Sequence, residues 1–162
     1  MNKRILTWLC AAAAAAAVTI PSISAAEIPS QSIVSISQNA LSAQEQQAAA
    51  LINRYRQQAG VSSVKLSASL SQQARVKSRD MKNNRYFSHT SPTYGSSFSL
   101  MRTMGVAYES AAENIAMGYY SAEDVVIAWL NSPSHRSAML SDRYTTIGIG
   151  YVDGYWTLWL LR

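Results

Sequence analysis

The sequence predicts an α+β domain whose helices come first and whose strands close the chain. Helix-capping patterns followed by apolar residues at helical spacing fill the middle of the chain. Two β-branched and aromatic runs, TTIGIGYV and YWTLWLL, stand at its end. Because helices and strands are segregated rather than alternating, the pattern favours α+β over an alternating α/β fold.

Residues 1–26 have the pattern of a secretory signal peptide and are excluded from the fold. Lys3 and Arg4 precede an alanine-rich apolar run from Ile5 to Ile20, and Ser24-Ala25-Ala26 offers small residues for cleavage. The alternative is a membrane anchor, but this run is shorter than the roughly 20 residues of a spanning helix. We therefore expect export to the periplasm or the medium, with no transmembrane anchor after cleavage.

Residues 27–41 are rich in Ser, Gln and Ile and are predicted to be a linker to one domain, 42–162. Cleavage of the signal peptide removes Cys10, the only cysteine, so the domain depends on its apolar core. It also lowers the formal net charge from +5 to +3, because Lys3 and Arg4 are lost.

The first two helices are predicted by their caps. Ser42-Ala-Gln-Glu45 is a capping box, and Gly60 ends the helix that follows. The next helix runs from about Ala68 to Asn84 after Ser67, with Leu70, Ala74 and Met81 on its core face.

Three short segments follow before the strands. Residues 99–104 are predicted to form a short helix stopped by Gly105, and Ser121-Ala-Glu-Asp124 caps a helix that contains Trp129. Ser132-Pro133 restarts a helix, with serine at the N-cap and proline at the first position. Asp153-Gly154 between the final apolar runs predicts a β-hairpin with a type I′ turn.

Positive charge is concentrated in the first half of the domain. Arg75, Arg79 and Lys82 recur at i, i+4 and i+7 of the second helix and are expected to face solvent or an anionic component of the envelope. A solvated basic face is the plainer interpretation. Nucleic acid suits the charge but not the export signal, so no nucleic-acid partner is expected.

His89, in FSHTSP, and His135, in SPSHR, are the only histidines. His135 falls near the third residue of a helix, where the free N–H groups disfavour imidazolium and keep the ring neutral. Glu113 lies in SAAENIAMG among small residues, where a buried carboxylate needs a partner. The default interpretation of each histidine is a surface or capping residue. The spacing of the three residues matches no short metal motif.

Five segments in order resemble the CAP superfamily, named for cysteine-rich secretory proteins, antigen five and pathogenesis-related proteins. They are LINRYRQQAGV with VKLSASLSQQA, FSHTSP, AAENIA, WLNSPSHRSAML and YTTIGIGYVDGYWTLWL. The resemblance covers about Ser42 to Leu161. It implies a three-layer α-β-α sandwich with a mainly antiparallel central sheet.

The resemblance also implies that His89, Glu113 and His135 converge in one cleft with Asn131 and Ser132. In many members of the family such a cleft can hold a divalent metal, often zinc, which implies His89 and His135 as ligands in this chain. The second acid of the family is missing, because Asn131 and Ser132 are not acidic. Ser134, Ala112 and Leu158 depart from the family pattern more mildly.

Three hypotheses for function follow. The first is an exported binding module whose cleft takes a metal, a small molecule or an apolar, lipid-like ligand. The second is a metal-dependent, peptidase-like hydrolase in which Glu113 and His135 are catalytic; a serine nucleophile is the variant, although no G-x-S-x-G motif is present. The third is a structural role for the histidines. The missing acid favours binding over catalysis.

Overall fold

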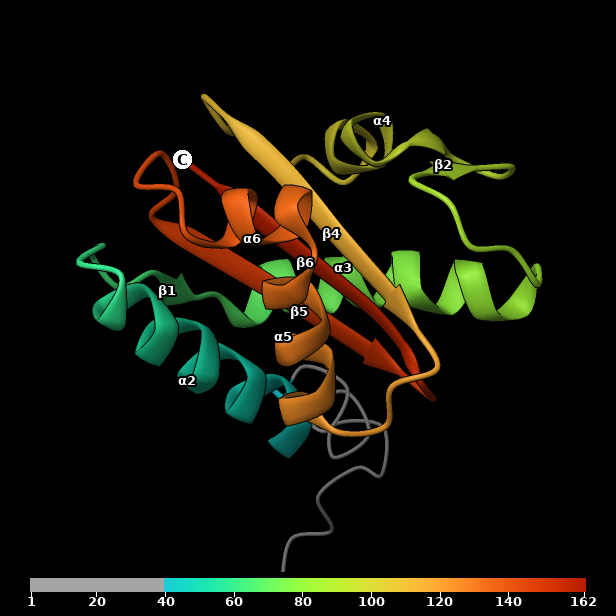
Figure 1. The fold of residues 1–162 in the computed structure, drawn as a ribbon. Helices are drawn as coiled ribbons and strands as arrows, with labels where there is room; N and C mark the ends of the chain where they lie inside the picture. The colour runs from blue at the N-terminus through green and yellow to red at the C-terminus, as the bar shows by residue number, and fades with distance from the viewer. Residues whose placement is uncertain (1–39) are drawn as a thin grey trace, which may run out of the picture.

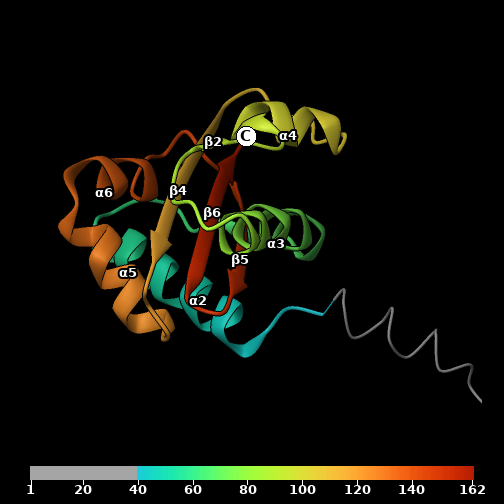
Figure 2. The same ribbon diagram turned by 90° about the vertical axis from the view of Figure 1, so that its right-hand side faces the viewer.

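The computed structural model describes residues 40–162. The predicted signal peptide (1–26) and all but the last two residues of the predicted linker (27–41) lie outside them. The described chain folds into three layers, with a sheet between two groups of helices (Figures 1 and 2). The predicted α+β class and α-β-α architecture are therefore confirmed. Within residues 40–162, none of the helices combines the length and apolarity that a membrane crossing requires.

Helices α2, α5 and α6 cover one face of the sheet, and α3 and α4 cover the other (Figure 2). The bounds are α2 Ala43–Gln58, α3 Ala68–Asn83, α4 Ser97–Thr103, α5 Ala122–Asn131 and α6 Pro133–Met139. The strands are β1 Lys65–Leu66, β2 Thr90–Ser91, β3 Gly95–Ser96, β4 Ala111–Met117, β5 Thr146–Val152 and β6 Tyr155–Leu161.

The main sheet has the order β1-β5-β6-β4, and only the short β1–β5 pair is parallel. The predicted hairpin joins β5 to β6, and both turn residues have positive φ, 50° at Asp153 and 83° at Gly154. β4 was not predicted, because Ala, Glu and Asn have low strand propensity. It forms because all seven of its residues pair with β6, and it lies at an edge of the sheet.

The predicted caps are present with small shifts. Ser42 and Glu45 form the capping box, and the hydroxyls of Ser67 and Ser121 cap α3 and α5. α4 begins at Ser97 rather than 99, because the Ser96 hydroxyl accepts from the Ser99 N–H at 3.1 Å. Ser132 occupies the N-cap of α6 before Pro133, but its side chain makes no capping hydrogen bond.

Alternate residues of β6 enter the two halves of the core. Trp156, Leu158 and Leu160 pack under α2 and α5, whereas Trp159 and Leu161 pack against Leu70 and Ala74 of α3. On β5 the α3 side carries two glycines, Gly148 and Gly150, at the centre of the strand. A Cβ at Gly150 would lie 2.3 Å from backbone atoms of Ala74 and Arg75, so glycine lets α3 lie directly on the sheet.

Two polar side chains of α2 explain the motif NRYR. Asn53 exchanges two hydrogen bonds with the backbone of Val64, at 2.8 and 3.0 Å. The buried guanidinium of Arg56 donates to the carbonyls of Ser62, Met139 and Ser141, each at 2.8 Å. Arg56 therefore fixes the C-terminal end of α6 against α2.

The predicted basic stripe on α3 is not one exposed surface. Arg75 turns inward, where its Nε lies 2.6 Å from Oε1 of the fully buried Glu45. Glu45 also accepts from the backbone N–H groups of Ser42 and Tyr151. Arg79 is exposed, and Lys82 pairs with Asp153 at 2.6 Å. The expectation for Arg75 was wrong because helical spacing alone could not reveal a buried acid on α2.

Candidate functional site

The edge strand β4 separates the two halves of the predicted site. Glu113 is in register with Trp159 and therefore lies on the sheet face that α3 and α4 cover. Its neighbour Asn114 points to the opposite face, where its amide donates to the backbone carbonyl of His135 at 3.0 Å. Two consecutive residues of β4 thus make the two contacts: Glu113 contacts the His89 side chain, and Asn114 contacts the backbone of His135.

The buried carboxylate of Glu113 holds the exposed imidazole of His89. His89 Nδ1 lies 2.7 Å from Glu113 Oε1, and the two side chains are 58% and 3% exposed. The other oxygen, Oε2, accepts from the indole N–H of Trp159 at 2.8 Å and from the Ser97 hydroxyl. Both oxygens of Glu113 thus act as acceptors, and Nε2 of His89 is the ring nitrogen that remains for a ligand.

A buried lysine beneath the loop helps to fix His89. Lys77, on α3, is fully buried and its ammonium donates to the carbonyls of Ser88 and His89, at 2.7 and 3.4 Å, and to the Tyr86 hydroxyl at 3.1 Å. Desolvation lowers the pKa of Lys77, and the negative charges of Glu113 and Asp80 oppose that shift. The lysine therefore ties the loop to α3 beside the Glu113 carboxylate.

Asp80, one turn along α3, holds the remainder of the same loop. It accepts from Ser91 at 2.6 Å, Thr93 at 3.0 Å, Asn84 at 2.6 Å and the Tyr86 hydroxyl. Burial raises the pKa of this carboxyl, but the four hydrogen bonds outweigh it, and the pKa lies below its usual value. Burial and the same carboxylate raise the pKa of Tyr86 above its usual range.

Sequence reasoning missed this network, although a signal was available. Lys77 lies on the same helical face as Ala74 and Met81, three and four residues away. A charge within an apolar stripe indicates a buried and partnered side chain. Ser97 and Trp159, by contrast, carry no sequence signal that links them to Glu113.

His135 is the third residue of α6, as predicted, and it lies half-buried. Its pKa is lowered first by desolvation and then by the positive charge of His89. This is the direction that the sequence predicts, and burial and the second histidine both contribute to it.

An apolar cavity of about 310 Å³ adjoins His135. Ile115 and Trp129 form its inner wall, and Phe87 and Met117, 48% and 47% exposed, stand at its rim. Ser132 and His135 are among its polar lining residues. A small molecule with an apolar body and one polar group matches this combination of surfaces.

The predicted cleft residues are only partly brought together. His89 and Glu113 are in contact, and Ser132 and His135 line the cavity. Asn131 lies elsewhere, in a neighbouring pocket of about 540 Å³ on the flank of α5. The break between α5 and α6 turns the chain between Asn131 and Ser132, which a motif of consecutive letters cannot indicate.

The donor set for a metal is small. Among residues 40–162, no three His, Cys, Asp or Glu side chains group closely enough to hold an ion. The Glu113 oxygens are occupied by His89, Ser97 and Trp159, so the carboxylate stands behind His89 rather than beside a metal. Two imidazoles remain as direct donors, with water as the source of further ligands.

By sequence, the chain matches one protein family and two proteins of Bacillus subtilis. The model of the cysteine-rich secretory protein family, abbreviated CAP, matches residues 49–158. The uncharacterized protein YkwD of Bacillus subtilis is 45% identical over 121 residues, 74% of this chain and 47% of that protein. The uncharacterized membrane protein YlbC of the same organism is 44% identical over 80 residues, 49% of this chain and 23% of the relative. This chain therefore spans less than half the length of either relative.

Solved structures show the same fold. An extracellular SCP-domain protein of Bacillus anthracis has a TM-score of 0.72 and 32% identity, over 74% of this chain and 40% of that one. An outer surface protein of Borrelia burgdorferi has a TM-score of 0.65 over 70% of this chain and 88% of its own length. At 20% identity, the second likeness concerns the fold alone.

Proposed function

The chain belongs to the cysteine-rich secretory protein (CAP) family, and we propose that it is an exported module that binds a small amphipathic ligand. The observation that carries the proposal is the cavity of about 310 Å³ beside His135. The signal-peptide pattern supports export, as does the extracellular SCP-domain neighbour among solved structures.

The lining of the cavity sets the class of ligand. Ile115 and Trp129 are buried, and Phe87 and Met117 expose apolar surface at the rim, so ligand burial removes apolar area from water. The volume is at the small end of ligand pockets, which favours one acyl chain or a small ring system over a large polycyclic ligand. His135, neutral near pH 7, supplies a hydrogen-bond donor and an acceptor for the polar group.

The geometry favours binding over hydrolysis. A general base needs a carboxylate that can take and release a proton, whereas Glu113 is 3% exposed and accepts from three side chains. The serines that were candidate nucleophiles make other contacts. Ser88 accepts from the Thr90 N–H, and the hydroxyls of Ser132 and Ser134 lie 3.4 Å apart. These contacts support an orienting role for Glu113 and a binding role for the cavity.

The test is displacement of the fluorescent probe N-phenyl-1-naphthylamine by decanoic acid. We expect saturable binding of the probe, competition by the fatty acid, and about tenfold weaker binding in Phe87→Ser. Phe98→Ser is the matched control, because Phe98 is 41% exposed on α4 and does not line the cavity. Equal binding in the two variants overturns the proposal.

A divalent metal is the second candidate, and the contact between Glu113 and His89 favours it. A histidine that ligates a metal commonly donates its other ring N–H to a carboxylate, as His89 Nδ1 is placed to do. His89 and His135 would hold the ion, and zinc suits imidazole donors. Calorimetric titration with zinc tests this. Unchanged affinity in the double variant His89→Ala/His135→Ala eliminates the site.

A further inference from the structure

We propose that the pocket on the flank of α5, beside Tyr120, is a second binding site that takes a neutral saccharide. It has a volume of about 540 Å³ and is lined by Tyr119, Tyr120, Asp124, Ile127 and Asn131 among others. Tyr119 and Ala128 also line the cavity beside His135, so the two sites are neighbours. Tyr120, Asp124 and Asn131 line only this pocket, so the proposed site goes beyond the proposed function in its own side chains and in its class of ligand.

The first support is an exposed aromatic side chain on a rigid loop. Tyr120 is 67% exposed, the most of the large apolar side chains exposed in residues 40–162. Its backbone carbonyl accepts from the Gln44 amide at 3.0 Å, and the oxygen of the same amide accepts from the Ala122 N–H at 2.9 Å. One side chain of α2 therefore fixes the loop on both sides of Ser121.

The β5–β6 hairpin holds the other end of this loop. The indole N–H of Trp156 donates to the Tyr119 carbonyl at 2.7 Å, and the Gly118 N–H donates to the Gly154 carbonyl at 2.9 Å. Gly154 also lies directly beside the Tyr120 ring, since a Cβ there would come within 3.1 Å of it. The aromatic ring is thus preorganised, so a ligand that stacks on it loses little entropy in ordering the loop.

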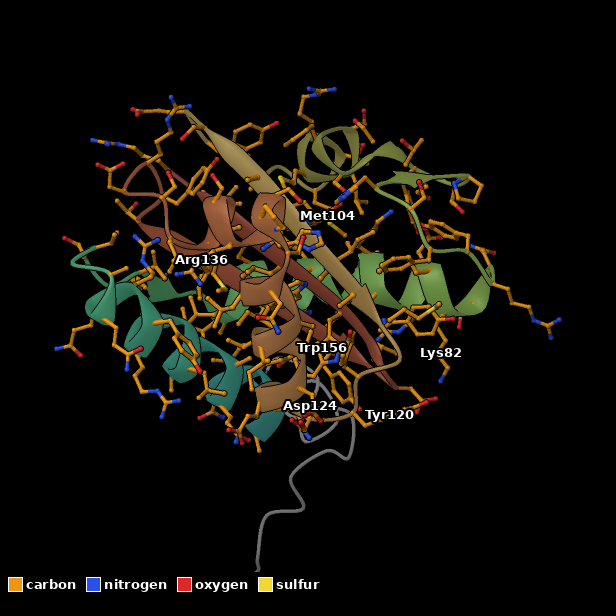
Figure 3. The ribbon with its side chains drawn as sticks, viewed as in Figure 1. Lys82, Met104, Tyr120, Asp124, Arg136 and Trp156 are labelled. Atoms are coloured by element: carbon orange, nitrogen blue, oxygen red, sulfur yellow. The ribbon has the colours of Figure 1, made fainter. Side chains whose placement is uncertain are left out.

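The polar side chains of the pocket are of the kind that hydroxyl groups need. Asp124 projects from the first turn of α5, near Tyr120, as Figure 3 shows. Its Oδ2 accepts from the Ser121 hydroxyl at 2.6 Å, and Oδ1 has no partner within residues 40–162. The Asn131 amide, at the other end of α5, likewise has no side-chain hydrogen bond within that range and offers both donors and an acceptor.

These features together select the ligand. The C–H face of a pyranose ring carries partial positive charge and stacks on the negative face of an aromatic ring. Its hydroxyls donate to a carboxylate and exchange hydrogen bonds with an amide. Asp124 is the only charged lining residue, and its negative charge disfavours anionic polymers and lipid phosphates. A neutral sugar unit satisfies the ring, the acid and the amide at once.

The test is an NMR titration of the ¹⁵N-labelled full chain with two neutral probes, chitotetraose and maltotetraose. We expect saturable shifts of the backbone amides of Gly118, Tyr120 and Gly154 with at least one probe. Affinity should fall about tenfold in Tyr120→Ala and stay within about twofold in Tyr120→Phe, because the ring and not its hydroxyl provides the stacking surface. Asn131→Ala, which leaves the loop intact, should also weaken binding.

Two controls separate this site from the cavity. Tyr94→Ala, which removes another exposed tyrosine, and His135→Ala should both bind the saccharide as the parent chain does. Either of two results overturns the proposal: no saturable shifts with either saccharide up to about 10 mM, or equal affinity in Tyr120→Ala. Neither of these results bears on the binding of decanoic acid beside His135.

Discussion

His89 Nδ1 lies 2.7 Å from Glu113 Oε1, and the pair joins an exposed imidazole to a buried carboxylate. Three donors converge on that carboxylate, from the loop, from α4 and from β6. A group with this many partners is costly to alter, and its orientation is set by the fold. The exposed histidine is thereby held in one orientation by residues that a ligand never touches.

Glu113→Gln should change the tautomer of His89. The glutamine oxygen can still accept from Ser97 and Trp159, but the amide N–H₂ group then faces His89 Nδ1, which must accept. The imidazole proton should move to Nε2, and ¹⁵N NMR of the labelled ring measures this directly. The loss of charge-assisted hydrogen bonds should also lower the free energy of unfolding by about 1–3 kcal/mol.

Glu109→Gln is the control for that experiment, because Glu109 is 84% exposed and its contact with Arg162 spans 3.7 Å. It should leave both the tautomer and the stability unchanged. A proton that stays on Nδ1 in Glu113→Gln contradicts the proposed orientation of His89.

His135 should titrate below pH 6.5, because burial first and the charge of His89 second lower its pKa. As the pH falls through 6.5 the unfolded chain takes up a proton that the folded chain does not, so the free energy of unfolding decreases. His135→Gln should remove this contribution, and His89→Ala should raise the pKa of His135. NMR titration of the ring protons measures both, and a pKa of His135 at or above 6.5 contradicts the prediction.

Gly150→Ala should destabilise the domain by about 3 kcal/mol, because its Cβ would overlap the backbone of α3 and force the helix off the sheet. Gly60→Ala is the matched control. No atom lies within 4 Å of a Cβ at Gly60, and only its φ of +72° opposes the substitution, which costs about 1 kcal/mol. Urea unfolding of the two variants measures the difference, and equal midpoints would refute close packing of α3 as its cause.

Arg56→Met should lower the free energy of unfolding by about 3 kcal/mol or more, because three carbonyl oxygens at 2.8 Å lose their donor. The end of α6 is then released, so the ring-proton shifts of His135 should change as well. Arg54→Met serves as the control, since Arg54 is exposed and packs over the ring of Tyr55. A stable variant with unaltered His135 shifts would contradict the role given to Arg56.

The sequence predicted those features whose causes are local. The capping box at Ser42, the Asp153-Gly154 turn and the restart at Pro133 depend on residues within one turn of each other. β4 escaped prediction because its pairing with β6 joins residues that are 38 to 50 positions apart. The inward turn of Arg75 escaped for the same reason, since its partner Glu45 lies 30 residues earlier.

The candidate site shows the same difference between local features, which the sequence predicts, and long-range contacts, which it does not. The three residues His89, Glu113 and His135 were predicted from family motifs, and the structure adds how the first two meet. The assignment of Asn131 to the same cleft depended on its place in the motif, and the turn between α5 and α6 separates it from His135. The apolar lining of the cavity, with Phe87, Ile115 and Trp129, comes from three separate segments, which no motif connects.

Consecutive residues of β4 contact the two halves of the site, Glu113 on one face and Asn114 on the other. Insertion or deletion of a single residue in this strand would exchange the acid and the amide between faces. Both histidines would lose their partners in one event, and no compensating substitution at a single position could restore them. Length variation among descendants of this chain should therefore be tolerated in the loops at either end of β4 and eliminated within it.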